Sequence, residues 1–317
     1  MAKKFWSDKK VLVTGGNGFL GSHLIEYLKK QGLKETNLKI PGSKKFDLRK
    51  QSVARKLTKN TDIVIHLAAN VGGIGYNRDK PGELFYDNVL LGIHMLEESR
   101  KNGVKKFVSI GTVCAYPKFT PVPFKEDDLW NGYPEETNAP YGIAKKMLLV
   151  QGQSYRQQYG FNVIYLLPVN LYGPRDKFDP KQSHVIPALI KKFYDAKVNN
   201  EKEVIVWGTG KATREFLFVE DAVRAIALAT QKYDKSDPVN LWASFEISIK
   251  KLAELISRLV GFKGKIVFDP TKPDGQPRRK LDTSRAEKEF GFKSKVNFEE
   301  GLKKTIKWYE KEFRRKA

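Results

Sequence analysis

The feature that most constrains the fold is a glycine-rich turn near the start of the chain. Glycines occupy positions 15, 18 and 21, between an apolar β-branched run at 10–14 and a helical pattern from His23 to Gln31. Glycines in this context let the backbone turn tightly and approach a pyrophosphate, and the helix that follows offers it unpaired N–H groups. The turn therefore predicts an α/β fold that binds a dinucleotide.

Apolar strand patterns and helical patterns alternate through the first half of the chain. The strands are expected at 62–69, 105–111 and 162–168, and the helices at about 82–102 and from Tyr141 toward Tyr159. This alternation predicts a Rossmann-type, doubly wound parallel sheet. Residues 169–183 are expected to form a loop.

The second half of the chain is less regular and predicts a smaller C-terminal α/β domain that binds substrate. Its expected elements are helices at about 185–197, 249–260 and 298–314, a strand at 203–207 and a basic, proline-rich loop at 270–280. Ligands of open α/β sheets bind at the carboxyl ends of the strands, where such a domain would lie. We expect the dinucleotide-binding domain to comprise 1–172 and 213–243, and the substrate domain 173–212 and 244–317.

Composition excludes several classes of function. The 58 Lys and Arg against 36 Asp and Glu give a net charge of +22, but the basic residues are spread along the chain without a nucleic-acid-binding motif, so no nucleic-acid partner is expected. No apolar run is long enough to span a membrane, and the N-terminal lysines precede no signal-like apolar stretch. The single cysteine, Cys114, excludes an intramolecular disulfide and favours a cytoplasmic location.

The segment after the expected second strand bears on the choice of cofactor. NAD-binding folds commonly place an acid here to hold the ribose hydroxyls, whereas residues 38–45 contain no acid and end in two lysines. This favours the 2′-phosphate of NADP, with Ser43 and Lys44 as its contacts. The alternative is that these lysines are merely solvated, which leaves NAD possible.

A tyrosine and a lysine are spaced for proton transfer. Tyr141 and Lys145 stand at i and i+4, which places them on one face of a helix. The ammonium would favour the phenolate and lower the tyrosine pKa, so that the tyrosine could exchange a proton with a carbonyl or alcohol oxygen. Thr112 lies just beyond a strand end, where its hydroxyl could bind the same oxygen.

Longer blocks of sequence show a family resemblance over nearly the whole chain. The chain resembles the extended short-chain dehydrogenase/reductases, and within them the enzymes that epimerise and reduce GDP-4-keto-6-deoxy-D-mannose. The blocks that carry this resemblance are His66–Ala69 with Val71–Ile74, Gly111–Lys118, Thr137–Tyr141 with Lys145, Asn170–Pro174, Ser183–Leu189, Trp207–Gly210, Arg214–Phe216 and Lys272–Gly275. The block around Cys114 and the block that begins Ser183-His184 are the most specific of these.

The resemblance implies a two-part, NADPH-dependent reaction. The sugar would be epimerised at carbons 3 and 5, and its 4-keto group would then be reduced to give GDP-L-fucose. By position, Cys114 matches the family's epimerisation base, His184 its acid, and Tyr141 with Lys145 the reductive proton donor and its helper. Matching substrate positions are Asn170, Lys192, Trp207 and Arg214. Cofactor positions are Gly15, Asn17, Gly18, Phe19, Leu20, Gly21, Ser43, Lys44, Asp47, Leu48, Leu67, Ala68, Ala69, Tyr141 and Lys145.

Two departures from the family pattern affect these expectations. Thr112 stands where serine is usual, which keeps the hydroxyl and adds a methyl group, and Asn17 stands where many members have an arginine near the 2′-phosphate. The family also implies a homodimer formed through the 82–102 and 141–159 helices, and no metal.

Three alternatives remain open at this stage. The same catalytic set would serve an epimerase or 4-ketoreductase of a related nucleotide sugar, such as a dideoxyhexose or a heptose, or an NAD-dependent sugar epimerase. A non-enzymatic nucleotide-sensing protein would not need the complete set of proton-transfer residues. Trp207 could be a core residue, and we expect His23, His66 and His94 to be structural.

Overall fold

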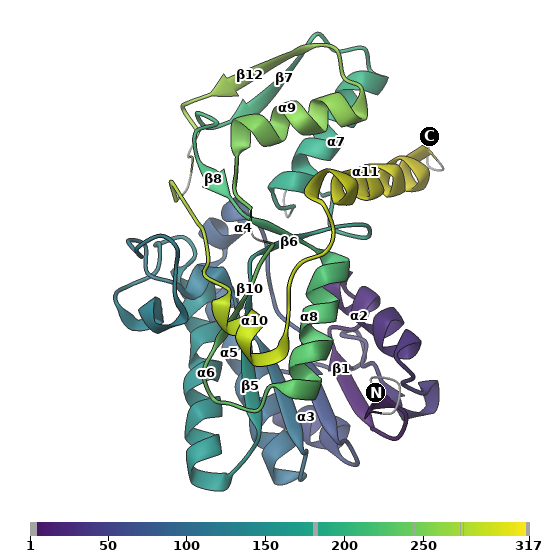
Figure 1. Ribbon diagram of the computed structural model, residues 1–317, viewed down its shortest axis with the longest axis vertical. Coiled ribbons are helices and arrows are strands. Elements are labelled where there is room, and N and C mark those ends of the chain that lie inside the picture. The colour runs from purple at the N-terminus through teal and green to yellow at the C-terminus, as the bar shows by residue number, and fades with distance from the viewer. Residues whose placement is uncertain (1–4, 180–182, 244, 273, 275, 315–317) are drawn as a thin grey trace.

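The centre of the molecule is a six-stranded, fully parallel sheet. The computed structural model describes residues 5–179, 183–243, 245–272, 274 and 276–314. The strand order is β10-β5-β4-β3-β1-β2 (Figure 1), with bounds β1 Val11–Thr14, β2 Leu38–Lys39, β3 Ile63–His66, β4 Lys106–Ile110, β5 Val163–Pro168 and β10 Val239–Leu241. The predicted doubly wound fold is confirmed.

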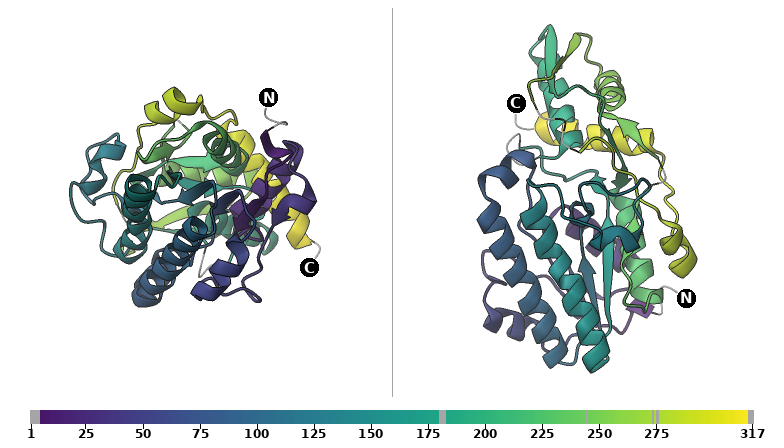
Figure 2. Two further views of the ribbon diagram at one scale, coloured as in Figure 1. Left: turned by 90° about the horizontal axis from the view of Figure 1, so that it is seen from below. Right: turned by 90° about the vertical axis from the view of Figure 1, so that its left-hand side faces the viewer.

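The strands are apolar on both faces because helices cover both. Val11 and Val13 pack into one core and Leu12 into another, and β3 repeats this alternation around Val64. The helices of this part of the chain are α2 Phe19–Lys30, α3 Gln51–Thr58, α4 Ile74–Asp79, α5 Pro81–Lys101, α6 Ala139–Tyr159, α8 Val219–Lys232 and α10 Ser284–Phe290. Seen from its end, the sheet lies between helices (Figure 2, left).

Two predicted element boundaries and one predicted loop are wrong. Helix α2 begins at Phe19 rather than His23, because the glycine turn leads directly into it. Strand β3 ends at His66, earlier than the predicted Ala69, since the chain turns away there toward the glycine loop. The predicted 169–183 loop contains strand β6 Asn170–Tyr172, which pairs with β9 Phe216–Phe218.

The upper part of the molecule in Figure 1 has a separate apolar core. Strands β7 Glu203–Trp207 and β12 Lys265–Asp269 pair in parallel, and their core also includes Tyr172 and Phe216. Its helices are α7 Val185–Val198, α9 Ile249–Val260 and α11 Phe298–Arg314, and a short antiparallel pair joins β8 Thr213–Arg214 to β11 Ile247–Ser248. Helix α9 begins where the Ser248 hydroxyl accepts the Lys251 N–H and ends at Gly261 with a positive φ.

The division into domains stays a proposal, which the packing refines. Leu281, Ala286 and Phe290 belong to the core of the parallel sheet, although they follow the substrate-domain segment that begins at 244. We therefore propose that residues 281–292 pack with the dinucleotide-binding domain.

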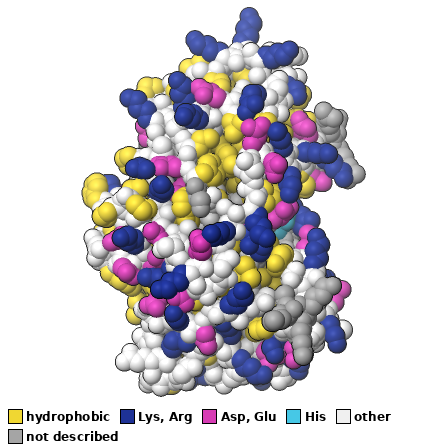
Figure 3. All heavy atoms as spheres, viewed as in Figure 1, with side chains coloured by type: hydrophobic (Ala, Val, Ile, Leu, Met, Phe, Trp, Pro, Cys, Tyr) yellow, Lys and Arg dark blue, Asp and Glu magenta, His cyan; other side chains and the backbone are white. Residues whose placement is uncertain are grey.

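The surface shows no single basic stripe on the face in Figure 3, where lysine and arginine side chains lie among acidic ones. Within the described residues, no helix combines the length and apolar character needed to cross a membrane.

Candidate active site

The glycine turn lies where the strand order reverses, between β1 and β3. Gly15 has a φ of 69°, and a Cβ there would lie 2.8 Å from the Ala68 amide nitrogen, so the turns after the two strands are in contact. The Ala68 N–H also donates to Thr14 Oγ1 at 3.2 Å. Open α/β sheets bind ligands in the crevice at such a switch point.

The start of α2 forms a cradle for phosphate. Gly18 caps the helix without a side-chain hydrogen bond, and its first turn contains no acidic residue. A Cβ on Gly21 would lie 2.2 Å from the Gly15 carbonyl oxygen, whereas one on Gly18 would approach only that oxygen, at 3.2 Å. Close packing on one side and open N–H groups on the other fit the pyrophosphate of a dinucleotide.

The predicted 2′-phosphate contacts lie beside this cradle. Ser43 and Lys44 are exposed, and a Cβ on neighbouring Gly42 would lie 3.7 Å from Asn17 Nδ2. Asp47 is bound by Arg49, which lowers the pKa of that carboxyl, and Leu48 is buried. The cofactor roles of all these residues stay predictions.

The proton-transfer residues meet where α6 packs against the turn after β4. This turn, η2 Val113–Ala115, carries Cys114, and a Cβ on Gly142 would lie 2.4 Å from the Cys114 carbonyl oxygen. Only glycine allows this approach, which brings the adjacent Tyr141 close enough for the Cys114 charge to affect it. Lys145, one turn further along α6, is 3% exposed.

Burial sets the protonation of this pair. It lowers the pKa of Lys145 to about 8 and, with a smaller contribution from Cys114, raises the pKa of Tyr141. The expectation that the tyrosine pKa is lowered is therefore wrong for this site, because desolvation of the phenolate and the Cys114 charge both raise it. Tyr141 is a neutral phenol, which suits a proton donor to a ketone oxygen.

Thr112 is also oriented for donation. Its Oγ1 accepts the Cys114 N–H at 3.2 Å and thereby caps η2. With an acceptor lone pair used in this way, the hydroxyl proton stays available for an oxygen in the site.

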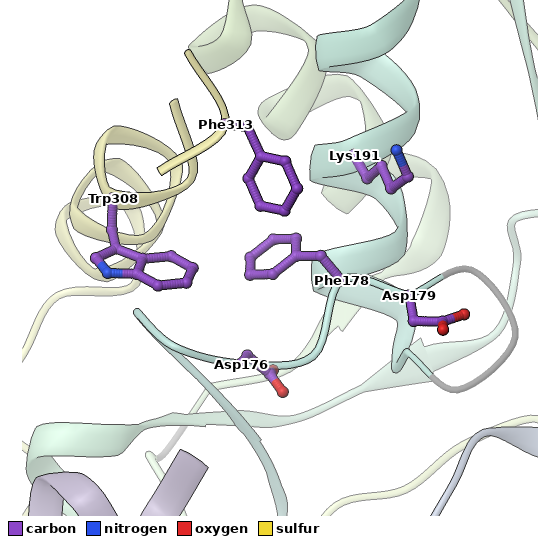
Figure 4. Close-up of a pocket in the computed structure, with 6 residues that line it drawn as sticks. All are labelled: Asp176, Phe178, Asp179, Lys191, Trp308 and Phe313. Atoms are coloured by element: carbon purple, nitrogen blue, oxygen red, sulfur yellow. The ribbon is translucent and has the colours of Figure 1, made fainter. Parts of the chain in front are cut away.

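His184 lies at the start of α7, and Phe178, which precedes it in the chain, packs among aromatic rings. The Phe178 ring is 4.4 Å from Tyr309 and 5.8 Å from Trp308 between centroids. In Figure 4, three rings group together and the carboxylates of Asp176 and Asp179 point away from them. The His184 side chain keeps accessible surface, yet partial desolvation lowers the pKa of its imidazole below the ordinary value.

The predicted substrate residues form two separate groups. Lys192 Nζ lies 5.6 Å from the centre of the Trp207 ring, which is 62% exposed and therefore not a core residue. Arg214 donates to the carbonyl oxygens of Thr213 and Asp274, and burial lowers its pKa to about 10. Asn170 Nδ2 donates to the Glu215 carbonyl oxygen at 3.5 Å.

Two residues near the site were not singled out from the sequence. Arg279 Nη1 lies 3.8 Å from Cys114 Sγ, and the Glu215 carboxylate accepts the Leu281 N–H at 2.8 Å. The density of basic residues at 278–280 was a signal for the first, but a lysine- and arginine-rich loop does not reveal which side chain turns inward. Glu215 follows Arg214 directly, within a block that carried the family resemblance.

The three histidines expected to be structural make contacts within the fold, and the Lys145 charge acts on His66. His66 is buried and shares a 2.8 Å hydrogen bond with Thr14 Oγ1, and burial lowers its pKa to about 3. His23 bonds to the Pro174 carbonyl oxygen at 2.9 Å, and His94 lies part-buried on α5.

Comparisons with known proteins agree with this geometry. Residues 11–242 match the model of the NAD dependent epimerase/dehydratase family. The chain is 41% identical over 313 residues to the protein named probable GDP-L-fucose synthase 1 of Oryza sativa subsp. japonica, covering 96% of this chain and 94% of the relative.

Two solved structures are similar over almost their whole length. A GDP-L-fucose synthetase from Naegleria fowleri bound to NADP has a TM-score of 0.87 and 32% identity, over 97% of this chain and 94% of that one. A GDP-6-OMe-4-keto-L-xylo-heptose reductase from C. jejuni has a TM-score of 0.91 and 28% identity, over 96% and 99%.

Proposed function

The chain belongs to the NAD dependent epimerase/dehydratase family, and from that premise we propose that it converts GDP-4-keto-6-deoxy-D-mannose to GDP-L-fucose with NADPH. The observation that carries the proposal is the packing of Cys114 against the helix of Tyr141 and Lys145. A reductase needs the tyrosine and lysine, and the thiol beside them adds a base for epimerisation.

In the epimerisation, the Cys114 thiolate takes a proton from the carbon beside the ketone. The C–H electron pair moves onto the ketone oxygen, where the hydroxyls of Tyr141 and Thr112 hydrogen-bond to the enolate. His184 returns a proton on the opposite face, which inverts the carbon. The same exchange serves carbon 3 and carbon 5, since both are next to carbon 4.

In the reduction, the glycine turn would hold NADPH, which when bound supplies a hydride. Tyr141 donates its phenolic proton to the carbonyl oxygen, and the Lys145 ammonium stabilises the phenolate that this leaves. We propose that the basic side chains of Lys192 and Arg214 attract the GDP diphosphate.

The experiment that tests the proposal supplies GDP-4-keto-6-deoxy-D-mannose and NADPH in deuterated water and analyses the product by NMR. We expect GDP-L-fucose with deuterium at carbons 3 and 5. Reduction without deuterium or inversion would contradict the epimerase half, and no turnover would contradict both halves.

A second candidate is reduction of a related GDP-linked keto sugar. The similarity to the heptose reductase favours it, because that structure matches this chain with a TM-score of 0.91. Comparing kcat/KM for a 6-deoxy and a heptose 4-keto substrate separates the two, and a preference for the heptose would replace the first proposal.

The proposed preference for NADP over NAD can be tested by reversing the charge of Lys44. Lys44→Glu should lower the ratio of kcat/KM with NADPH to that with NADH by about 10- to 100-fold, because a charge-assisted phosphate contact becomes repulsive. The control is Lys45→Glu, since Lys45 Nζ lies over the Phe46 ring at 5.8 Å. An unchanged ratio in Lys44→Glu would move the 2′-phosphate site elsewhere.

The rate of reduction should fall as pH rises through about 8. The pKa of Lys145 is lowered to about 8, so the ammonium is present below that pH and lost above it. In Lys145→Arg the falling limb should move to higher pH, because arginine stays charged. The measurement is kcat for reduction from pH 6 to 10, and a wild-type rate that stays constant to pH 10 would contradict the role of Lys145.

The finer expectations of assembly and location are also proposals. Apolar side chains are exposed along α5 and α6, which lie side by side (Figure 2, right): Phe85, Tyr86, Met147, Val150 and Tyr159. We propose that two copies cover them as a four-helix bundle. A thiol that acts as a base must stay reduced, which supports a cytoplasmic location that cell fractionation would test.

The dimer proposal predicts that Val150→Asp makes the protein monomeric. Wild-type protein should have twice the 36.2 kDa chain mass by light scattering, and the variant one chain mass, because the new carboxylate would be buried at the interface. The control is Ile205→Asp, a half-exposed apolar site on β7. A dimeric Val150→Asp protein would place the interface elsewhere.

A further inference from the structure

A short segment links the two apolar cores across the candidate site. This strap, residues 276–282, runs from the region of β7 and β12 down to α10 (Figure 1). Gln276 Nε2 donates to the Lys118 carbonyl oxygen. The Phe124 N–H donates to the Lys280 carbonyl oxygen, and the Asp282 N–H donates to the Phe124 carbonyl oxygen. The strap is therefore held against the segment that follows Cys114.

Two neighbouring arginines of the strap, Arg278 and Arg279, have different partners. Arg278 forms an ion pair with Glu246, with Nε 2.8 Å from Oε1. Arg279 turns inward, and its Nη1 lies 3.8 Å from Cys114 Sγ while its Nε donates to the neutral Gln276 amide oxygen. Within the described residues, no carboxylate lies within ion-pair distance of Arg279.

Two carboxyl groups of nearby segments, those of Asp274 and Glu215, form hydrogen bonds with groups other than Arg279. Asp274 accepts hydrogen bonds from the Thr209 N–H and hydroxyl, each at 2.7 Å. Glu215 is buried, which raises its pKa to about 9, and its carboxyl group accepts the Leu281 N–H. The Arg279 charge is therefore not cancelled by an acidic partner.

A second guanidinium adds to the positive charge around the thiol. Arg214 donates to two backbone carbonyl oxygens. Burial, and after it the Arg279 charge, lowers the pKa of Arg214 to about 10. The Asp274 carboxylate opposes part of this charge at Arg214, whereas Arg279 lies directly beside the sulfur.

We propose that Arg279 is the positioning residue for Cys114, holding the sulfur beside a positive charge where it can take the proton in epimerisation. This inference rests on the proposed function. The guanidinium supplies charge and direction to the thiolate, while the proton itself passes from substrate carbon to sulfur.

The first test needs no substrate. Iodoacetate is anionic and iodoacetamide neutral, and both alkylate cysteine, so the ratio of their rates reports positive charge beside the thiol. Cys114 is the only cysteine, so mass spectrometry reports this site alone. For a unit charge ~5 Å from the reagent in water, Arg279→Gln should lower the iodoacetate-to-iodoacetamide ratio about fourfold.

Three variants complete the labelling test. Arg279→Lys should restore most of the ratio, because it restores the charge. Arg278→Gln removes the same charge from the same strap but leaves the ratio near the wild-type value, since its side chain pairs with Glu246. An unchanged ratio in a folded Arg279→Gln protein would overturn the proposal.

The second test measures deuterium exchange at carbons 3 and 5. Arg279→Gln should lower the kcat of exchange at least tenfold, and Arg279→Lys should recover part of it. If only KM rises, Arg279 serves substrate binding and the proposal is overturned. If wild-type protein shows the labelling pattern but no exchange, the proposed function fails, and the thiolate's role in epimerisation fails with it.

Discussion

Replacing Tyr141 by phenylalanine should lower the rate of 4-keto reduction by about 10²- to 10⁴-fold, the contribution expected of one general acid. The phenol is neutral because burial raises its pKa, so it carries the proton that the ketone oxygen needs when hydride arrives. Phenylalanine keeps the ring and loses only the hydroxyl. Exchange at carbons 3 and 5 should fall less, because Thr112 still donates to the enolate oxygen.

The measurement for this prediction is single-turnover oxidation of NADPH, followed by its absorbance. Tyr155→Phe is the matched control, since Tyr155 lies on the same helix but bonds to Glu97 at 2.7 Å, away from the site. It should reduce the substrate at the wild-type rate. If Tyr141→Phe also reduces at that rate, another group donates the proton.

The parallel sheet could be predicted because its signals are local. Buried strands such as 162–168 are short apolar runs, and the glycine turn has meaning only between a strand and a helix. Strand β6 was not predicted because three residues carry no periodicity. It exists through pairing with β9, which lies more than 40 residues further along the chain.

The same contrast between local and distant signals applies to the residues of the candidate site. Tyr141, Lys145 and Cys114 stand in recognisable blocks, so the sequence predicts them as site residues. The tyrosine pKa could not be predicted, because it depends on how deeply packing buries the phenol. The position of Arg279 depends on the strap crossing between two cores, and no local pattern encodes that path.

Replacing Cys114 by alanine should separate the two halves of the reaction. We expect deuterium incorporation at carbons 3 and 5 to fall by about 10²- to 10⁴-fold, because the general base is lost. Hydride transfer should continue, since Tyr141 and Lys145 are unchanged. The η2 turn should persist, because the Cys114 N–H rather than its thiol bonds to Thr112.

The measurement is NMR of the product formed in deuterated water, with hydride transfer followed on a sugar that already has the epimerised configuration. Tyr141→Phe provides the opposite comparison, because it should lose reduction more than exchange. A Cys114→Ala protein that exchanges both protons at the wild-type rate would assign the base elsewhere. Equal loss of exchange and reduction would instead mean that the thiol supports the site as a whole, since a base for epimerisation alone cannot slow hydride transfer.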